Sequence, residues 1–177
     1  MSSVLFLVVV LAISSLALAS SGRITIVKLV SEEDVDMALA NYTANLSEKS
    51  IKDKGSFSIV LSAGGTLIYT LSHIASLFPN RPQRYEKKRW VTYITDSPKP
   101  PPPRITLTFL VINSAAYIGM VVTDKEEANA VHVAIDHIVV SPTLPCAEVT
   151  VAEELTWLLD KDAASKLDGC DNNICLL

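Results

Sequence analysis

Segments with strand-like and helix-like hydrophobic patterns alternate along most of this 177-residue chain. The strand-like segments are rich in β-branched residues, and the helix-like segments repeat apolar residues every three or four positions. Strands are expected at 23–30, 56–63, 90–95, 104–109, 115–123 and 154–160. Helices are expected at 32–46, 66–78, 125–137 and 161–167. This alternation predicts an α/β fold, Rossmann-like, with a mostly parallel sheet and helices on both faces.

Residues 1–21 form a hydrophobic leader. Residues 4–13 are apolar without a break, and the first charged side chain is Arg23. Together with the small-residue segment 17–19, this pattern is typical of a secretory signal peptide, although the usual basic n-region is missing. The competing interpretation is a buried N-terminal helix or strand. A transmembrane helix needs about 20 apolar residues, so no stable membrane span is expected.

Residues 22–168 are predicted to form one domain, and residues 169–177 an unstructured tail. The formal net charge is −4 and no basic stripe is evident, so nucleic acid is not expected as a partner. Cys146, Cys170 and Cys175 do not have the spacing of metal ligands, and no metal site is predicted. If the chain is secreted, Cys170 and Cys175 could pair; otherwise three free thiols are expected.

A glycine pair follows the strand expected at 56–63. Gly64 and Gly65 allow a sharp turn, and a helix beginning near Thr66 would present free backbone N–H groups and the positive end of its dipole. A phosphate or other oxyanion fits such a place. The segment lacks the lysine of a P-loop and the spacing of a dinucleotide fingerprint. An ordinary tight turn between a strand and a helix is the open alternative.

Four prolines separate Lys99 from Arg104, directly before the strand expected at 104–109. Proline holds φ near −65° and favours polyproline II, which would place the two Cα atoms roughly 15 Å apart. A stiff segment of this kind fixes the direction of each cation. It suits a site that binds an anion, because little conformational entropy is lost on binding. A proline-rich loop with solvated charges is the alternative.

Several stretches together resemble the 6-phosphogluconolactonases, above all their plant members, which are related in fold to the glucosamine-6-phosphate isomerases/deaminases. These stretches are SAGGT (62–66), SHIASLFPNRP (72–82), the run from WVTYIT to SAAYI (90–118), AVHVAID (130–136) and ELTWLLDKDAAS (154–165). The resemblance covers about residues 22–168, and the stretch 90–118 is its most specific part.

The resemblance implies hydrolysis of 6-phosphoglucono-1,5-lactone in the oxidative pentose phosphate pathway. The partner would be this phosphorylated sugar lactone, and neither a metal nor an organic cofactor is implied. By position, Gly64, Gly65 and Thr66 match the phosphate loop, and Lys99 and Arg104 match the basic pair of the proline-rich motif. His73 matches the candidate general base, although a lone histidine beside apolar residues is more often structural.

The chain departs from the family pattern in its middle, where the glycine pair runs directly into the His73 segment and a long central stretch is missing. If 66–78 is one helix, His73 lies about 10 Å along it from Thr66, on its flank. The fold is therefore expected to be a truncated version, with new sheet edges that invite self-association. Three functions stay open: a lactone hydrolase, an inactive truncated member that binds sugar phosphates or other anions, and a sugar-phosphate isomerase/deaminase. The leader indicates the secretory pathway, whereas the resemblance indicates cytoplasm or plastid.

Overall fold

A computed structural model describes residues 6–10, 22–63, 86–95, 103–136, 149–150, 153–168 and 174–176 of the chain. The elements in chain order are β1 (Phe6–Val10), β2 (Arg23–Leu29), α1 (Glu32–Lys54), β3 (Ile59–Ala63), β4 (Val91–Ile94), β5 (Arg104–Leu107), α4 (Phe109–Ile112), β6 (Tyr117–Val122), the 3₁₀ helix η1 (Lys125–Glu127), α5 (Ala128–Asp136), β7 (Glu154–Asp160) and β8 (Ile174–Leu176).

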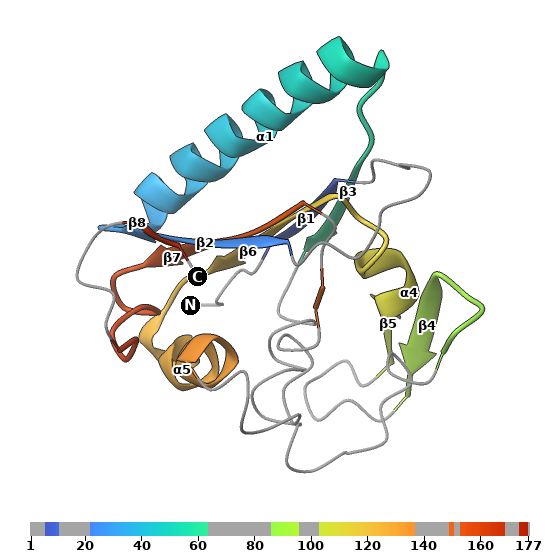
Figure 1. The fold of residues 1–177 in the computed structure, drawn as a ribbon. Coiled ribbons are helices and arrows are strands. Elements are labelled where there is room, and N and C mark those ends of the chain that lie inside the picture. Colours follow the sequence, from blue (N-terminus) through green and yellow to red (C-terminus); the bar gives the residue numbers. More distant parts are fainter. Residues whose placement is uncertain are drawn as a thin grey trace.

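A six-stranded sheet with the order β3-β1-β6-β7-β2-β8 forms the centre of the molecule. The strands β6, β7 and β2 are parallel neighbours, whereas β1 and β8 pair antiparallel with the strands beside them. Consequently β2, β3, β6 and β7 run in one direction and β1 and β8 in the other. Helix α1 covers one face of the sheet and α5 the opposite face (Figure 1). The predicted α/β architecture with helices on both faces is confirmed.

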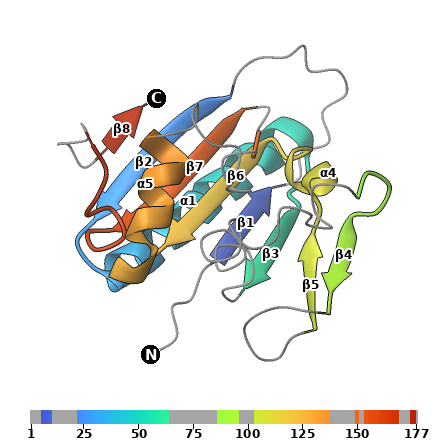
Figure 2. The same cartoon turned by 90° about the horizontal axis from the view of Figure 1, so that it is seen from below.

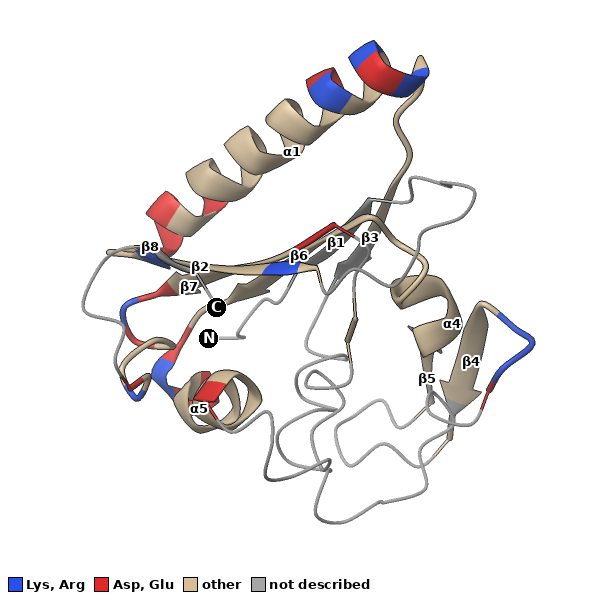
Figure 3. Ribbon diagram, in the orientation of Figure 1, with Lys and Arg blue, Asp and Glu red and all other residues tan. Residues whose placement is uncertain are grey.

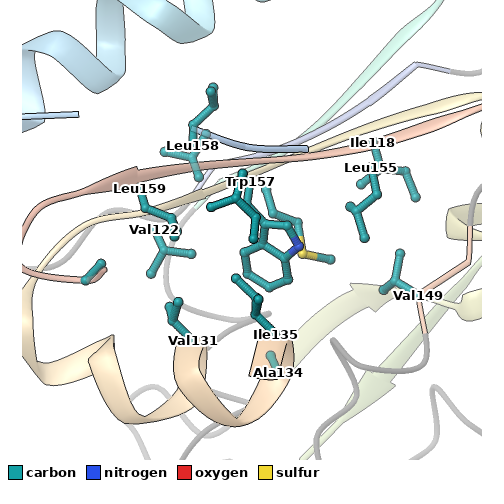
Figure 4. Packing of buried hydrophobic residues seen from close by; sticks show 14 of the residues in the cluster. Ile118, Val122, Val131, Ala134, Ile135, Val149, Leu155, Trp157, Leu158 and Leu159 are labelled. Atoms are coloured by element: carbon teal, nitrogen blue, oxygen red, sulfur yellow. The ribbon is translucent and has the colours of Figure 1, made fainter. Parts of the chain in front are cut away.

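The core lies on both sides of β6 and β7. All six residues of β6 are buried, as are all residues of β7 after Glu154. Successive side chains of a strand point to opposite faces, so Leu158 points toward the α1 side while Trp157 and Leu159 point toward α5 (Figure 4). Strands that are buried on both faces read as continuous apolar runs, which explains the sequences YIGMVV and LTWLL.

Helix α1 begins where its sequence predicts. The Ser31 hydroxyl accepts a hydrogen bond from the Asp34 backbone N–H (3.2 Å), and the Asp34 carboxylate accepts one from the Ser31 N–H (3.1 Å). Acidic residues occupy the first turn and Lys52 and Lys54 the last, so the side-chain charges complement the helix dipole (Figure 3). The helix ends at Gly55, whose φ of 72° requires glycine-like freedom.

Strands β4 and β5 form a separate two-stranded antiparallel sheet. The strand predicted at 104–109 ends at Leu107, and Phe109–Ile112 instead forms α4. The change occurs at Thr108, which is fully buried and whose carbonyl accepts hydrogen bonds from the Val111 and Ile112 N–H groups. Val111 and Ile112 are themselves buried in the main core, so α4 ties the hairpin to the rest of the domain.

Two strands lie in segments for which the sequence predicted something else. Phe6–Val10, within the leader, forms β1 between β3 and β6, in line with the alternative of a buried N-terminal strand. Ile174–Leu176 forms β8 along β2, so the tail predicted as unstructured contains a short strand. Pairing satisfies backbone groups at the β2 edge, which local sequence does not reveal. Secretory use of residues 1–21 stays a prediction.

Within the described ranges, none of the helices combines the length and the apolar character that crossing a membrane requires.

Candidate functional site

Among the residues predicted to bind or transform a ligand, Arg104 is the one whose backbone the structure describes. It begins β5, opposite Ile94 at the end of β4. Gly64, Gly65, Thr66, His73 and Lys99 lie outside the described residues. The described chain reaches Ala63, the last residue of β3, directly before the glycine pair. The structure therefore gives the two scaffolds from which the predicted site would be built.

The proline-rich segment is the connection of a β-hairpin. Because Ile94 pairs with Arg104, residues 95–103 join β4 to β5, and Lys99 belongs to that connection. The carboxyl end of β3 and the connected end of the hairpin point toward the same side of the molecule in both views (Figures 1 and 2). A site shared by Gly64 and Gly65 with Lys99 and Arg104 requires that these two ends point in the same direction.

The other end of the hairpin is fixed by Thr108. Its backbone N–H donates to the Trp90 carbonyl (2.9 Å), and its hydroxyl donates to the Arg89 carbonyl (2.7 Å). Thr108 is also the residue directly before α4, whose Val111 and Ile112 are buried in the core. Arg104 therefore stands on a strand that is held at its end by hydrogen bonds and packing, which favours a preorganised position.

A basic run, Lys87, Lys88 and Arg89, precedes β4 and is seen as a blue stretch beside it in Figure 3. The Glu86 carboxylate accepts hydrogen bonds from the backbone N–H groups of Lys88 (2.9 Å) and Arg89 (3.1 Å). These two bonds stabilise the charged carboxylate and hold the pKa of Glu86 below its usual range. The run lies at the end of the hairpin opposite the proline connection, so it offers matched control cations for Arg104.

One face of the hairpin is apolar and exposed. Tyr93 pairs with Ile105 and Val91 with Leu107, so these four side chains share a face. Tyr93 and Ile105 are 62% and 75% exposed. Exposed apolar patches of this kind often mark interaction sites. The self-association expected from the sequence stays a prediction.

A polar cluster that the sequence analysis did not anticipate lies where α1 crosses the sheet. Lys49 Nζ donates to the Tyr117 hydroxyl (2.5 Å), and that hydroxyl donates to the Glu153 carboxylate. Lys49 also lies 3.8 Å from Glu153 and 4.8 Å from the centre of the Tyr117 ring. Burial, followed by the bond to Glu153, raises the pKa of Tyr117, and the bond to Tyr117 raises the pKa of Lys49. These contacts connect Lys49 of α1 to Tyr117 of β6 and to Glu153, the residue before β7.

The hydroxyls of Tyr42 and Thr156 are both buried without a hydrogen-bond partner among the described residues. Burial raises the pKa of Tyr42 to about 12. An ionised phenolate is disfavoured there because burial removes the water that would solvate its charge.

The raised pKa predicts a specific loss of stability in alkali. Above pH 10 the unfolded chain ionises at Tyr42 while the folded chain does not, so the stability present below pH 10 is lost as pH rises toward 12. The full difference is about 2–3 kcal/mol, of which about half is lost by pH 11. We expect Tyr42→Phe to reduce the loss of stability between pH 8 and pH 11 by about this half, as measured by urea unfolding, while the part due to the raised pKa of Tyr117 remains. Tyr93→Phe, at an exposed position, should retain the wild-type pH dependence; equal pH dependence in wild type and Tyr42→Phe would refute the assignment.

The β4–β5 hairpin and β6 lie in the part of the chain that matches a known protein family. Residues 70–157 match the model of the family glucosamine-6-phosphate isomerases/6-phosphogluconolactonase, so this stretch is similar to that family.

Several plant proteins are similar to this chain. A probable 6-phosphogluconolactonase 4, chloroplastic, of Oryza sativa subsp. indica is 55% identical over 99 residues, which is 55% of this chain and 31% of the relative. A probable 6-phosphogluconolactonase 2 of Arabidopsis thaliana is 54% identical over 95 residues, 54% of this chain and 36% of the relative. A rice probable 6-phosphogluconolactonase 2 is 47% identical over 116 residues, 63% of this chain and 40% of the relative.

The chain thus spans about a third of the length of these relatives, which agrees with the truncation expected from the sequence. The crystal structure of a devB protein matches 45% of this chain and 34% of its own, with 22% identity and a TM-score of 0.36, a likeness too slight to carry an argument.

Proposed function

We propose that this chain is a 6-phosphogluconolactonase-like protein that binds 6-phosphoglucono-1,5-lactone and promotes its hydrolysis to 6-phosphogluconate. The observation that carries the proposal is the extent of the family match. Residues 70–157 include His73, Lys99 and Arg104, so three of the predicted site residues lie inside the matched segment. Gly64, Gly65 and Thr66 precede it, at the end of β3.

The phosphate is the part of the substrate for which the scaffold is best suited. Arg104 begins a strand anchored through Thr108, and Lys99 lies in a connection that contains five prolines, Pro98 and 100–103. Because proline restricts φ, such a connection loses little conformational freedom when a ligand binds. Two cations supported in this way would hold the phosphate dianion by charge-assisted hydrogen bonds, to which the amides after the glycine pair would add.

Hydrolysis requires a water molecule to attack the lactone carbonyl. In the proposed mechanism, the neutral imidazole of His73 accepts the proton of that water as the new C–O bond forms. The ring C–O bond then breaks, and the imidazolium returns its proton to the departing ring oxygen, which becomes a hydroxyl. The carboxylic acid formed in the same step releases its remaining proton to solvent and becomes the 6-phosphogluconate carboxylate. Phosphate binding at a distance orients the ring and supplies binding energy for this step.

A non-catalytic role as a sugar-phosphate binder is the second candidate. It is favoured by one observation: the chain spans 31–40% of the relatives named above, so much of their chain has no counterpart in this match. In that case the hairpin cations would bind the phosphate group while the lactone is not turned over.

The rate of lactone hydrolysis above the spontaneous rate, followed by pH-stat, tests the proposal. We expect His73→Ala to lower the catalysed rate by about 10²–10⁴-fold, to near the spontaneous rate. Arg104→Ala should weaken substrate binding by about 10- to 100-fold through loss of a charge-assisted contact. Lys88→Ala, which removes an exposed cation from the opposite end of the same hairpin, serves as the matched control and should change neither quantity.

A wild-type rate equal to the spontaneous rate would reject the hydrolase. Calorimetric titration with 6-phosphogluconate then separates the remaining cases. Binding that is lost in Arg104→Ala supports the non-catalytic binder, whereas no binding by the wild type rejects both functions.

A further inference from the structure

A histidine and two aspartates converge on the side of the molecule where α5 ends. His132 and Asp136 are one turn apart on α5, so their side chains lie on the same face of the helix. The His132 Nδ1 atom is 2.8 Å from Asp136 Oδ2. Asp168 joins them from the segment after β7, and its backbone N–H donates to Asp136 Oδ2 (3.1 Å). One ligand atom from each residue lies within 4.8 Å of the other two.

We propose that His132, Asp136 and Asp168 form a binding site for a divalent transition-metal ion, with Zn²⁺ as the best match. Imidazole nitrogen with carboxylate oxygen is a donor set used by Zn²⁺ and its first-row neighbours. Mg²⁺ and Ca²⁺ are hard ions that prefer oxygen ligands alone, and an imidazole does not favour them.

The spacing of the ligand atoms is near that of a metal-bound state. Ligand atoms about 2.0–2.2 Å from a tetrahedral Zn²⁺ lie roughly 3.3–3.6 Å from one another. The His132–Asp136 contact must therefore open by about 0.5 Å, which small side-chain rotations supply. Three protein ligands leave a fourth position for water, as in open zinc sites.

The surroundings of the cluster support a metal ion. His132 and Asp136 side chains are 25% and 18% exposed, so they are partly desolvated yet reachable from solvent. The Asp168 backbone N–H holds the Asp136 carboxylate in place, and hydrogen bonds of this kind orient metal ligands. In the sequence, β7 lies between α5 and Asp168. A bound ion would therefore connect the end of α5 to the segment that follows β7.

The experiment uses the full chain, stripped of metal with a chelator and dialysed. Co²⁺ is titrated in, because its visible absorption bands report inner-sphere coordination, and Zn²⁺ is then added in competition. We expect one equivalent of Co²⁺ to bind, with bands that Zn²⁺ abolishes. We expect His132→Ala and Asp168→Asn each to lower the affinity for Co²⁺ at least tenfold. Substitution of residues that merely hydrogen-bond to metal ligands already lowers metal affinity by about 10- to 100-fold.

Asp168→Asn is the sharpest variant because it keeps the backbone N–H that donates to Asp136, so its fold should be retained. The matched control is Asp162→Asn, which removes an exposed carboxylate six residues away in the same segment. Far-UV circular dichroism verifies that each variant is folded. Absence of stoichiometric binding to the wild type overturns the proposal, as does binding that is unchanged in either His132→Ala or Asp168→Asn. No substrate is needed, so the result is independent of lactone hydrolysis.

Discussion

Replacing Trp157 by alanine is expected to lower the free energy of unfolding by about 3–5 kcal/mol. Trp157 lies in β7, between β6 and β2, and is 3% exposed. Its indole points to the α5 face, close to Val131 and Ile135 in Figure 4. Truncation removes the largest side chain of this cluster and leaves a cavity that the paired strands on either side cannot close.

Trp90→Ala is the matched control because Trp90 is the other tryptophan of the chain and is 64% exposed. Surface substitutions of this kind usually change stability by about 0.5 kcal/mol or less. Urea unfolding followed by far-UV circular dichroism measures both variants without relying on tryptophan fluorescence. Equal losses from the two substitutions would show that β7 does not form the centre of the core.

Asp160→Ala is expected to lower the free energy of unfolding by about 2–4 kcal/mol, because two backbone N–H groups lose their acceptor. Asp160 ends β7 and is 9% exposed. Its Oδ1 accepts from the Ala163 N–H (2.7 Å) and its Oδ2 from the Asp124 N–H (3.1 Å). Asp124 has a φ of 92°, a conformation unfavourable for a residue other than glycine. Asp160 thus helps to hold a strained turn at the carboxyl end of β6.

Two further variants separate this role from a general effect of charge. Asp160→Asn keeps one carbonyl acceptor and should lose roughly half as much stability as Asp160→Ala. Asp162→Ala removes an exposed carboxylate two residues later and should lie within about 0.5 kcal/mol of the wild type. Thermal unfolding monitored by circular dichroism ranks the three proteins. A loss in Asp162→Ala as large as that in Asp160→Ala would show that the two hydrogen bonds do not explain the effect.

The acidic character of this edge also bears on function. Asp124 and Asp160 stand at the carboxyl ends of two parallel strands, the usual position of ligands in open α/β sheets. Negative side chains there disfavour a phosphate. Arg104, the predicted phosphate-binding residue whose backbone is described, begins β5 of the separate hairpin and not a strand of the main sheet.

Local patterns were sufficient for much of the architecture. The segment 154–160 was predicted as a strand and is β7, and the strand predicted at 115–123 contains β6. The helix expected to begin at residue 32 is α1, whose start is capped by Ser31. These elements are predictable because burial on both faces, or a side chain that caps its own helix, leaves a signal within a few neighbouring residues.

Other features depended on contacts between distant residues. Three strand pairings could not be predicted from local sequence. They are the pairing of β4 with β5, which makes 95–103 a hairpin connection, the insertion of Phe6–Val10 between β3 and β6, and the pairing of Ile174–Leu176 with β2. In each case, the sequence of a strand does not indicate which other strand it will pair with. The contact between Asp136 and Asp168 likewise joins residues that are 32 positions apart.

Hydrophobic periodicity and the family motifs in the chain thus indicated an α/β protein that resembles the 6-phosphogluconolactonases and suggested its candidate residues, because those signals are local. The tertiary structure decided which strands became neighbours and where the hairpin lies. It also decided which polar groups come together below α1 and beside α5. The physical reason is that pairing and burial are satisfied by whichever partners the packed chain brings together, and such partners are distant in sequence.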